Sequence, residues 1–300
     1  MGVYGNLIGK VEKCFYLCPM TLNQFKTLYQ EQLAPLYPEN EIYSLLQIVC
    51  EDLLNWSHSD FMRNNREEMN HLQEEVLHKS LRDLRTSKPV QYITGKAHFY
   101  GHEFAVNEHT LIPRQETEEL VHMIIKNHKS ETYLNMIDIG TGTGCIGLSL
   151  KDAMPSCSMT LVDVSKQALE TAQSNASHLK TPVKTILQDV LRLKELPEKY
   201  DVIVSNPPYV RNLEKQEIHD NVLKNEPHIA LFVDDSNALI FYRKILELAQ
   251  NSLKPKGTVY FEINQYLSEE MKALGTELAF DSEVFKDLNG NYRMMKCERI

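Results

Sequence analysis

The tetrapeptide Asn206-Pro207-Pro208-Tyr209 is the segment whose residue types most directly suggest chemistry. An amide or aromatic amine nitrogen is a poor nucleophile because its lone pair is delocalised. Two fixed acceptors for its hydrogens can aim that nitrogen at an electrophilic carbon. Asn206 offers its side-chain oxygen and Pro207 its backbone carbonyl, whose direction Pro208 restricts, while Tyr209 offers a flat face. These residues predict a binding site for a planar, nitrogen-bearing group, with Asn206, Pro207 and Tyr209 as catalytic residues.

A glycine-rich loop precedes this motif in the chain. Its glycines at 140, 142 and 144 alternate with Thr141 and Thr143. Glycine permits a tight turn and lets the backbone approach a ligand closely, and amides at the start of the next helix then face that ligand. The spacing indicates a nucleotide-like cofactor and does not identify which one.

Three acidic residues lie near the loop or at the ends of predicted strands. Asp163 stands ~20 residues beyond the loop, where a carboxylate bonds ribose hydroxyls in dinucleotide-binding folds. Asp138 is expected either to steady the loop or to meet an amino group of the cofactor. Asp189 could accept from an adenine amino group, and a surface turn explains its position nearly as well.

The predicted elements place these motifs at one edge of a sheet. Beyond residue 112, helices alternate with strands at residues 134–139, 159–163, 184–187, 200–205 and 258–263. Repeated βα units imply a parallel sheet covered by helices on both faces, with ligands at the carboxyl ends of the strands. Residues 284–288 and 292–297 flank Asn289-Gly290 and predict a closing hairpin. An α/β sheet with an antiparallel last strand is common among S-adenosylmethionine-dependent methyltransferases.

The preceding sequence is organised differently. Residues 1–20 are expected to be a disordered extension. Apolar residues at helical spacing predict a small all-helical domain over residues 21–90, with Thr21 as the first helix cap. The apolar period changes to two from Gln91, and residues 91–112 are expected to form a hairpin linker around Tyr100-Gly101-His102. The α/β domain then spans residues 113–300.

Bulk composition narrows the class of partner. The net charge of -9 argues against a nucleic-acid substrate and favours a basic protein partner, because phosphate binding needs positive charge. No apolar run reaches the ~18 residues of a membrane span. The six cysteines form no C-x-x-C pair, so we expect no metal and reduced thiols typical of a cytoplasmic protein.

Several motifs together carry a resemblance to a known family. These are residues 89–95 (Pro-Val-Gln-Tyr-Ile-Thr-Gly), 99–101, 111–118 (Leu-Ile-Pro-Arg-Gln-Glu-Thr-Glu), 138–144, 206–209, 226–231, 242–245, and Lys286-Asp287 with Gly290 and Arg293. In these motifs the chain resembles the release-factor glutamine methyltransferases, the HemK/PrmC family. The resemblance covers about residues 90 to 297, and the helical segment matches in kind rather than in motif.

That resemblance implies a fold and an activity. The family has a helical amino-terminal domain that recognises the substrate, a hairpin linker and a class I S-adenosylmethionine methyltransferase domain with a Rossmann-like seven-stranded sheet. Its members methylate the glutamine of a Gly-Gly-Gln loop in class 1 peptide chain release factors and so tune translation termination. S-adenosylmethionine is the donor and S-adenosylhomocysteine the product.

The resemblance also implies residue roles. Asn206, Pro207, Pro208 and Tyr209 would bind the glutamine amide, and Arg114 with Glu116 would lie at the rim. The expected cofactor residues are Asp138, Gly140, Thr141, Gly142, Thr143, Gly144, Asp163, Asp189, Val190 and Asn206. Two departures stand out. Val190 and Leu191 follow the acid where the family has a bulkier group to cover adenine, and Asn264 stands where a glycine is usual.

Three alternatives stay open on sequence alone. The first is an adenine or guanine amino-methyltransferase acting on nucleic acid, because such enzymes share the tetrapeptide. The charged residues of the helical segment are of mixed sign, however, which favours a solvent-exposed surface over a phosphate-binding surface. A glutamine methyltransferase acting on a ribosomal protein would use the same chemistry. The third alternative is a catalytically inactive cofactor-binding or assembly protein, which would not need two acceptors directed at a substrate nitrogen.

Overall fold

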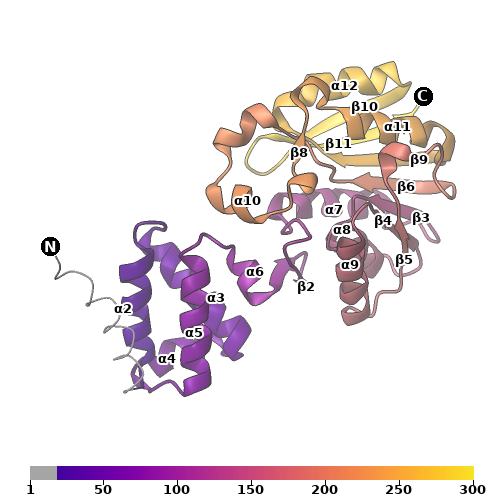
Figure 1. Cartoon of the computed structure of the whole chain (residues 1–300). Helices are drawn as coiled ribbons and strands as arrows, with labels where there is room; N and C mark the ends of the chain where they lie inside the picture. The colour runs from indigo at the N-terminus through magenta and orange to yellow at the C-terminus, as the bar shows by residue number, and fades with distance from the viewer. Residues whose placement is uncertain (1–18) are drawn as a thin grey trace. The chain divides into compact units, whose positions relative to one another are not determined.

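The computed structural model describes residues 19–300, which divide into two compact units with the boundary between Thr94 and Gly95 (Figure 1). Of the extension expected over residues 1–20, residues 1–18 lie outside the described residues. Met20, the last residue of that range, is buried, and its backbone amide donates to Glu74 Oε1 at 2.5 Å, so Met20 belongs to the folded unit. Within the described range, no helix has the length and apolarity needed to cross a membrane.

The first unit is helical, as the apolar spacing predicts. Its helices are α2 (Leu22–Leu33), α3 (Glu39–Leu54), α4 (His58–Arg63), α5 (His71–Leu84) and α6 (Val90–Thr94). α2 begins where Thr21 and Gln24 form a capping box, which confirms the predicted cap. Its buried residues, Leu22, Phe25, Tyr29 and Leu33, recur at helical spacing and join one apolar core with the other helices.

One sequence-based expectation fails at the unit boundary. The segment from Gln91 was expected to start a hairpin, yet Val90–Thr94 is helix α6. The amides of Tyr92 and Ile93 both donate to the Pro89 carbonyl, so Pro89 starts the turn. Gly95, at a φ of 75°, ends it in the left-handed conformation. The hairpin proper is β1 (Lys96–Phe99) and β2 (His102–Ala105), and it belongs to the second unit.

The second unit is built on a seven-stranded sheet with the order β10-β11-β9-β6-β3-β4-β5. Its strands are β3 (Asn135–Ile139), β4 (Ser158–Asp163), β5 (Lys184–Leu187), β6 (Tyr200–Ser205), β9 (Leu253–Glu262), β10 (Phe280–Lys286) and β11 (Tyr292–Arg299). β11 runs antiparallel to both of its neighbours, and the other pairs are parallel. The expected class I methyltransferase fold is therefore confirmed, with the last strand inserted between β9 and β10.

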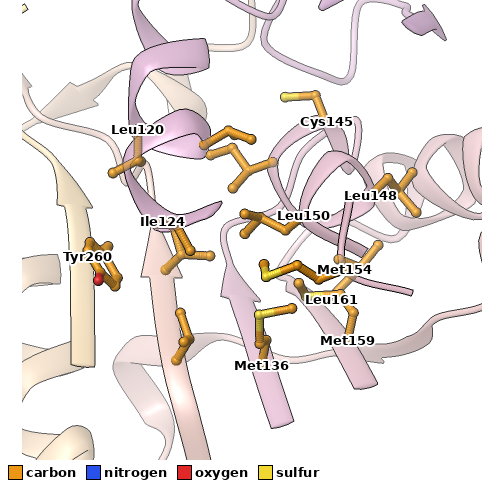
Figure 2. Packing of buried hydrophobic residues seen from close by; sticks show 14 of the residues in the cluster. Leu120, Ile124, Met136, Cys145, Leu148, Leu150, Met154, Met159, Leu161 and Tyr260 are labelled. Carbon is orange, nitrogen blue, oxygen red and sulfur yellow. The ribbon is translucent and has the colours of Figure 1, made fainter. Parts of the chain in front are cut away.

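Helices cover both faces of this sheet. α7 (Gln115–His128), α8 (Cys145–Ala153) and α9 (Lys166–His178) pack in one apolar cluster, and α11 (Ile240–Ser252) and α12 (Ser268–Glu277) pack in another. Figure 2 shows the first cluster, where side chains of α7 and α8 meet those of β3 and β4. Met136 belongs to one cluster and its neighbour Ile137 to the other, because successive side chains of a strand point to opposite faces.

Four elements of this unit, α12, β7, β8 and α10, were not expected from the sequence. α12 is short, and the acidic Glu269 and Glu270 of its first turn were its main sequence signal. The segment after β6 forms the small parallel pair β7 (Val210–Arg211) and β8 (Phe232–Val233), with α10 (Asp220–Asn225) between them. The segment follows the acceptor motif directly, and the Val210 amide donates to the Leu231 carbonyl at 2.9 Å.

Candidate active site

The strand order brings the functional segments to one edge of the sheet. β9, β6, β3, β4 and β5 are parallel neighbours, so their carboxyl ends lie side by side. β9 ends at Glu262, β6 is followed by Asn206, β3 by the glycine loop, β4 ends at Asp163, and β5 is followed by Asp189. The acceptor motif and the loop are thus adjacent.

A cavity of about 320 Å³ lies at this edge. Such a volume suits a small-molecule or cofactor ligand. Among the predicted site residues, its lining includes Gly140, Thr141, Gly142, Thr143, Asp163, Asp189, Val190, Asn206, Pro207 and Pro208. Asp138, Gly144 and Tyr209 do not line it. The structure therefore gathers most of the predicted residues around one space and leaves these three outside its lining.

The glycine loop is shaped for close approach to a ligand. Gly142 has a φ of +54°, and a Cβ there would meet no atom within 4 Å, so it would point into open space. Gly144 serves packing, since its Cβ would lie 3.0 Å from Leu148 and 3.2 Å from Ala172. The loop therefore turns tightly against α8 and leaves its backbone bare toward the cavity.

Asp138 steadies the loop from below, the first of its two expected roles. Its Oδ2 accepts from the Thr141 hydroxyl at 2.6 Å and from the Gly147 amide at 3.1 Å. Its Oδ1 is buried with no hydrogen-bond partner. Burial raises the pKa of Asp138 to about 7. Because Asp138 is fully buried and does not line the cavity, the structure supports the loop-steadying role and not direct contact with a cofactor.

Asp163 connects β4 to the loop. Its Oδ2 accepts from the Gly142 amide and its Oδ1 from the Ser165 amide, each at 2.9 Å. Burial raises the pKa of this carboxyl. Ser165 is the N-cap of α9, so the capping role that competes for Asp163 belongs to Ser165. Asp163 stands at the cavity wall with acceptor capacity for ribose hydroxyls.

The residues that follow β5 line the part of the cavity where adenine is expected to bind. Asp189 Oδ1 accepts from the Leu191 amide at 3.0 Å, and its Oδ2 lies 3.1 Å from Arg192 Nε. Val190 is buried and, like Leu191, lines the cavity. These two aliphatic side chains supply an apolar wall where a bulkier group was expected from the resemblance.

Asn206 is held by a chain of hydrogen bonds that sequence spacing did not indicate. Its Nδ2 donates to Thr117 Oγ1 at 3.3 Å, and that hydroxyl donates to Glu262 Oε2 at 2.5 Å. The other carboxylate oxygen, Oε1, accepts from the Tyr209 hydroxyl at 2.8 Å. Burial raises the pKa of Glu262, which the Thr117 and Tyr209 hydroxyls and nearby Arg293 oppose. One buried carboxylate thus anchors both ends of the acceptor motif.

Tyr209 is fixed at both its side chain and its backbone. Its hydroxyl is bound to Glu262, and burial raises its pKa. The Asn264 side chain donates to the Tyr209 carbonyl at 3.0 Å and to Glu214 Oε2 at 2.9 Å. Asn264, the departure from the usual glycine, therefore ties the acceptor loop to the end of β9.

Arg114 pairs with Glu226. Its Nη2 lies 2.6 Å from Glu226 Oε1, and Glu226 Oε2 accepts from the Ile112 amide at 3.2 Å. The Glu226 carboxylate is nearly inaccessible, while Arg114 is partly exposed and lines the cavity. Glu116 acts on Glu262 by charge. Arg114 thus ties the cavity wall to Glu226, a residue outside the lining that precedes the lining residues Ile229 and Ala230 in the chain.

The residues present fit S-adenosylmethionine. The backbone of the glycine loop is open toward the cavity, and the Asp163 carboxylate at the cavity wall would accept from the ribose hydroxyls of the cofactor. Thr117 and Glu262 were missed as site residues. A usable signal for Glu262 was its place at the carboxyl end of a predicted parallel strand, the same rule that singled out Asn206.

Two family models match the chain. The PrmC N-terminal domain matches residues 29–95, and the methyltransferase small domain matches residues 115–230. The release factor glutamine methyltransferase of Flavobacterium psychrophilum is 44% identical, covering 92% of this chain and 99% of its own length. The enzyme of the same name from Bacteroides thetaiotaomicron is 37% identical, covering 93% and 100%.

Solved structures agree on the fold. A methyltransferase from Pyrococcus furiosus, 18% identical, aligns with a TM-score of 0.50 over 74% of this chain and 99% of its own. An identity of 18% supports a shared fold only, whereas the sequence relatives identify the family. With their identity extending over almost the whole chain, this protein belongs to the release factor glutamine methyltransferases, a family of S-adenosylmethionine-dependent enzymes.

Proposed function

We propose that this protein methylates the side-chain amide nitrogen of the glutamine in the Gly-Gly-Gln motif of class 1 peptide chain release factors, in the cytoplasm. The observation that carries the proposal is the position of Asn206. It lines the same cavity as the glycine loop and Asp163, so an acceptor amide held by it would lie beside the cofactor.

The proposed roles follow from this placement. Gly140 to Thr143, Asp163, Asp189 and Val190 hold S-adenosylmethionine, which supplies an electrophilic methyl group when bound. Asn206 Oδ1 and the Pro207 carbonyl accept the two amide hydrogens and orient the nitrogen. Tyr209 lies outside the cavity lining, so its part is to fix the end of the acceptor motif through its hydroxyl bond to Glu262. No strong base is required, because the alkylated nitrogen is acidic and its proton passes to water. Catalysis is then mostly positioning.

The helical unit contributes substrate recognition in this proposal. It corresponds to the PrmC N-terminal domain at residues 29–95 and shares no predicted cofactor residue. The acidic net charge of the chain suits a basic protein partner better than a nucleic acid. A basic surface of the release factor outside its Gly-Gly-Gln loop would then add to binding.

The test is to incubate the protein and isotopically labelled S-adenosylmethionine with a release factor, with ribosomal proteins and with tRNA in separate reactions. Mass spectrometry should place one methyl group on the glutamine of the Gly-Gly-Gln motif. A release factor with that glutamine replaced by glutamate is the matched control and should stay unlabelled. Label confined to a ribosomal protein or to tRNA would reject the proposal.

A further inference from the structure

The hydroxyl of Thr117 lies between a buried carboxylate and the acceptor motif. Thr117 belongs to the first turn of α7 and is buried. Its Oγ1 is 2.5 Å from Glu262 Oε2 on one side and 3.3 Å from Asn206 Nδ2 on the other. Segments 89 and 145 residues away from Thr117 in the chain thus converge on one hydroxyl.

The proton count of this hydroxyl decides which way the Asn206 amide faces. A hydroxyl has one proton, and an ionised carboxylate only accepts. Each oxygen of Glu262 receives one hydroxyl, from Thr117 or Tyr209, and Arg293 adds a nearby positive charge. The two hydroxyls and Arg293 favour the ionised form of Glu262 against the effect of burial. With Glu262 ionised, the Thr117 proton is committed to Glu262, and only lone pairs remain toward Asn206.

An asparagine side chain has two ends of nearly equal size, so its shape alone does not orient it. Here only the NH₂ end is compatible with the lone pairs of Thr117. The reversed amide would set oxygen against oxygen in a buried place, which is unfavourable. The Oδ1 end consequently faces away from Thr117, where it is free to accept.

We propose that Thr117, set by Glu262, is the positioning residue that turns the oxygen of Asn206 toward the methyl acceptor. The Asn206 oxygen in this position accepts a hydrogen bond from a substrate group that carries N–H. If the Asn206 amide were reversed, its NH₂ group would face the N–H groups of the substrate amide. Thr117 and Glu262 thereby favour a carboxamide over a carboxylate while acting only through Asn206. This inference rests on the proposed function and adds the device that sets its specificity.

The test compares Thr117→Val with Thr117→Ser, using release factor as the substrate. Valine keeps the shape and removes the hydroxyl, so kcat should fall about tenfold or more, since a misplaced catalytic group costs rate without contributing to cofactor binding. The dissociation constant for S-adenosylmethionine should stay at the wild-type value. Serine keeps the hydroxyl and should restore most of kcat.

Thr171→Val is the matched control. Thr171 is also buried, accepts from an asparagine amide (Asn107 Nδ2, 2.9 Å) and donates to an oxygen (Gln167 carbonyl, 3.0 Å), but it does not contact Asn206. Its kcat should match the wild type. Should valine at 117 prevent folding, Thr117→Ala and Thr117→Ser differ by the hydroxyl alone and carry the same comparison.

The outcomes separate the two proposals. Wild-type kcat in Thr117→Val, or equal loss in the serine and valine variants, would overturn the positioning role while leaving the proposed function intact. A wild-type protein that leaves the glutamine unmodified would overturn the proposed function and this inference together.

Discussion

The carboxylate of Asp163 accepts a hydrogen bond from the backbone amide of Gly142 at 2.9 Å, across the gap between two neighbouring parallel strands. The end of β4 therefore fixes the loop that follows β3. The contact joins the two strongest cofactor signals of the sequence into one wall of the cavity. A side chain at position 142 would both strain the loop and intrude on that wall.

We expect Gly142→Val to abolish binding of S-adenosylmethionine. Its φ of +54° disfavours a β-branched residue, and its open Cβ direction would carry the valine into the cavity. Isothermal calorimetry measures the loss. Gly101→Val is the control, because Gly101 has a φ of +79° and equally open space in the hairpin turn. Equal cofactor affinity in both variants would reject the loop assignment.

Asn206→Ala should slow methylation by about 10²-fold or more while leaving cofactor affinity close to the wild type. The physical reason is the loss of one fixed acceptor for the amide hydrogens. Single-turnover kinetics with release factor measures the effect. Asn127→Ala also removes a side-chain amide that donates to a hydroxyl, that of Tyr260, and should keep wild-type turnover. Normal turnover in Asn206→Ala would exclude the proposed role.

Asp138→Asn should stabilise the protein increasingly as pH rises from about 4 to about 7. The folded pKa of about 7 exceeds the ordinary value of 3.8, so the folded state holds its proton over this range while the unfolded chain releases it. The wild type therefore loses stability as pH increases through this window, and the neutral asparagine does not. Thermal unfolding of both proteins without cofactor from pH 4 to 8 measures the difference. A constant difference across that range would contradict the assignment.

Arg114→Gln should cost about 2 kcal/mol of unfolding free energy and weaken cofactor binding. It leaves the Glu226 carboxylate buried without its guanidinium, and the partial exposure of Arg114 reduces the usual penalty. Denaturant unfolding and calorimetry measure both effects. Arg243→Gln breaks a pair with Glu277 in which both side chains are exposed, and should change neither quantity measurably. Comparable losses in the two variants would show that the Arg114 pair does not brace the cavity.

The sequence predicted the frame of the catalytic unit because its signals are local. The strands at 134–139 and 200–205 follow from apolar runs bounded by turns, and the glycine loop follows from backbone requirements within five residues. The rule that parallel strands end at one edge then placed Asn206 beside that loop. The prediction that a hairpin starts at Gln91 was also wrong for a local reason. Pro89 and Gly95 delimit a short helix, Val90–Thr94, whose apolar residues also fit the pattern of a strand.

Only the tertiary structure decided which side chains hold the site in place. The Thr117–Glu262 and Arg114–Glu226 contacts join residues 145 and 112 apart in the chain, and no spacing rule pairs them. The order of β9 next to β6 is what brings Glu262 to the acceptor motif. The sequence determined which groups can do the chemistry. Their orientation depends on strand order and buried hydrogen bonds, which exist only once distant segments have packed together.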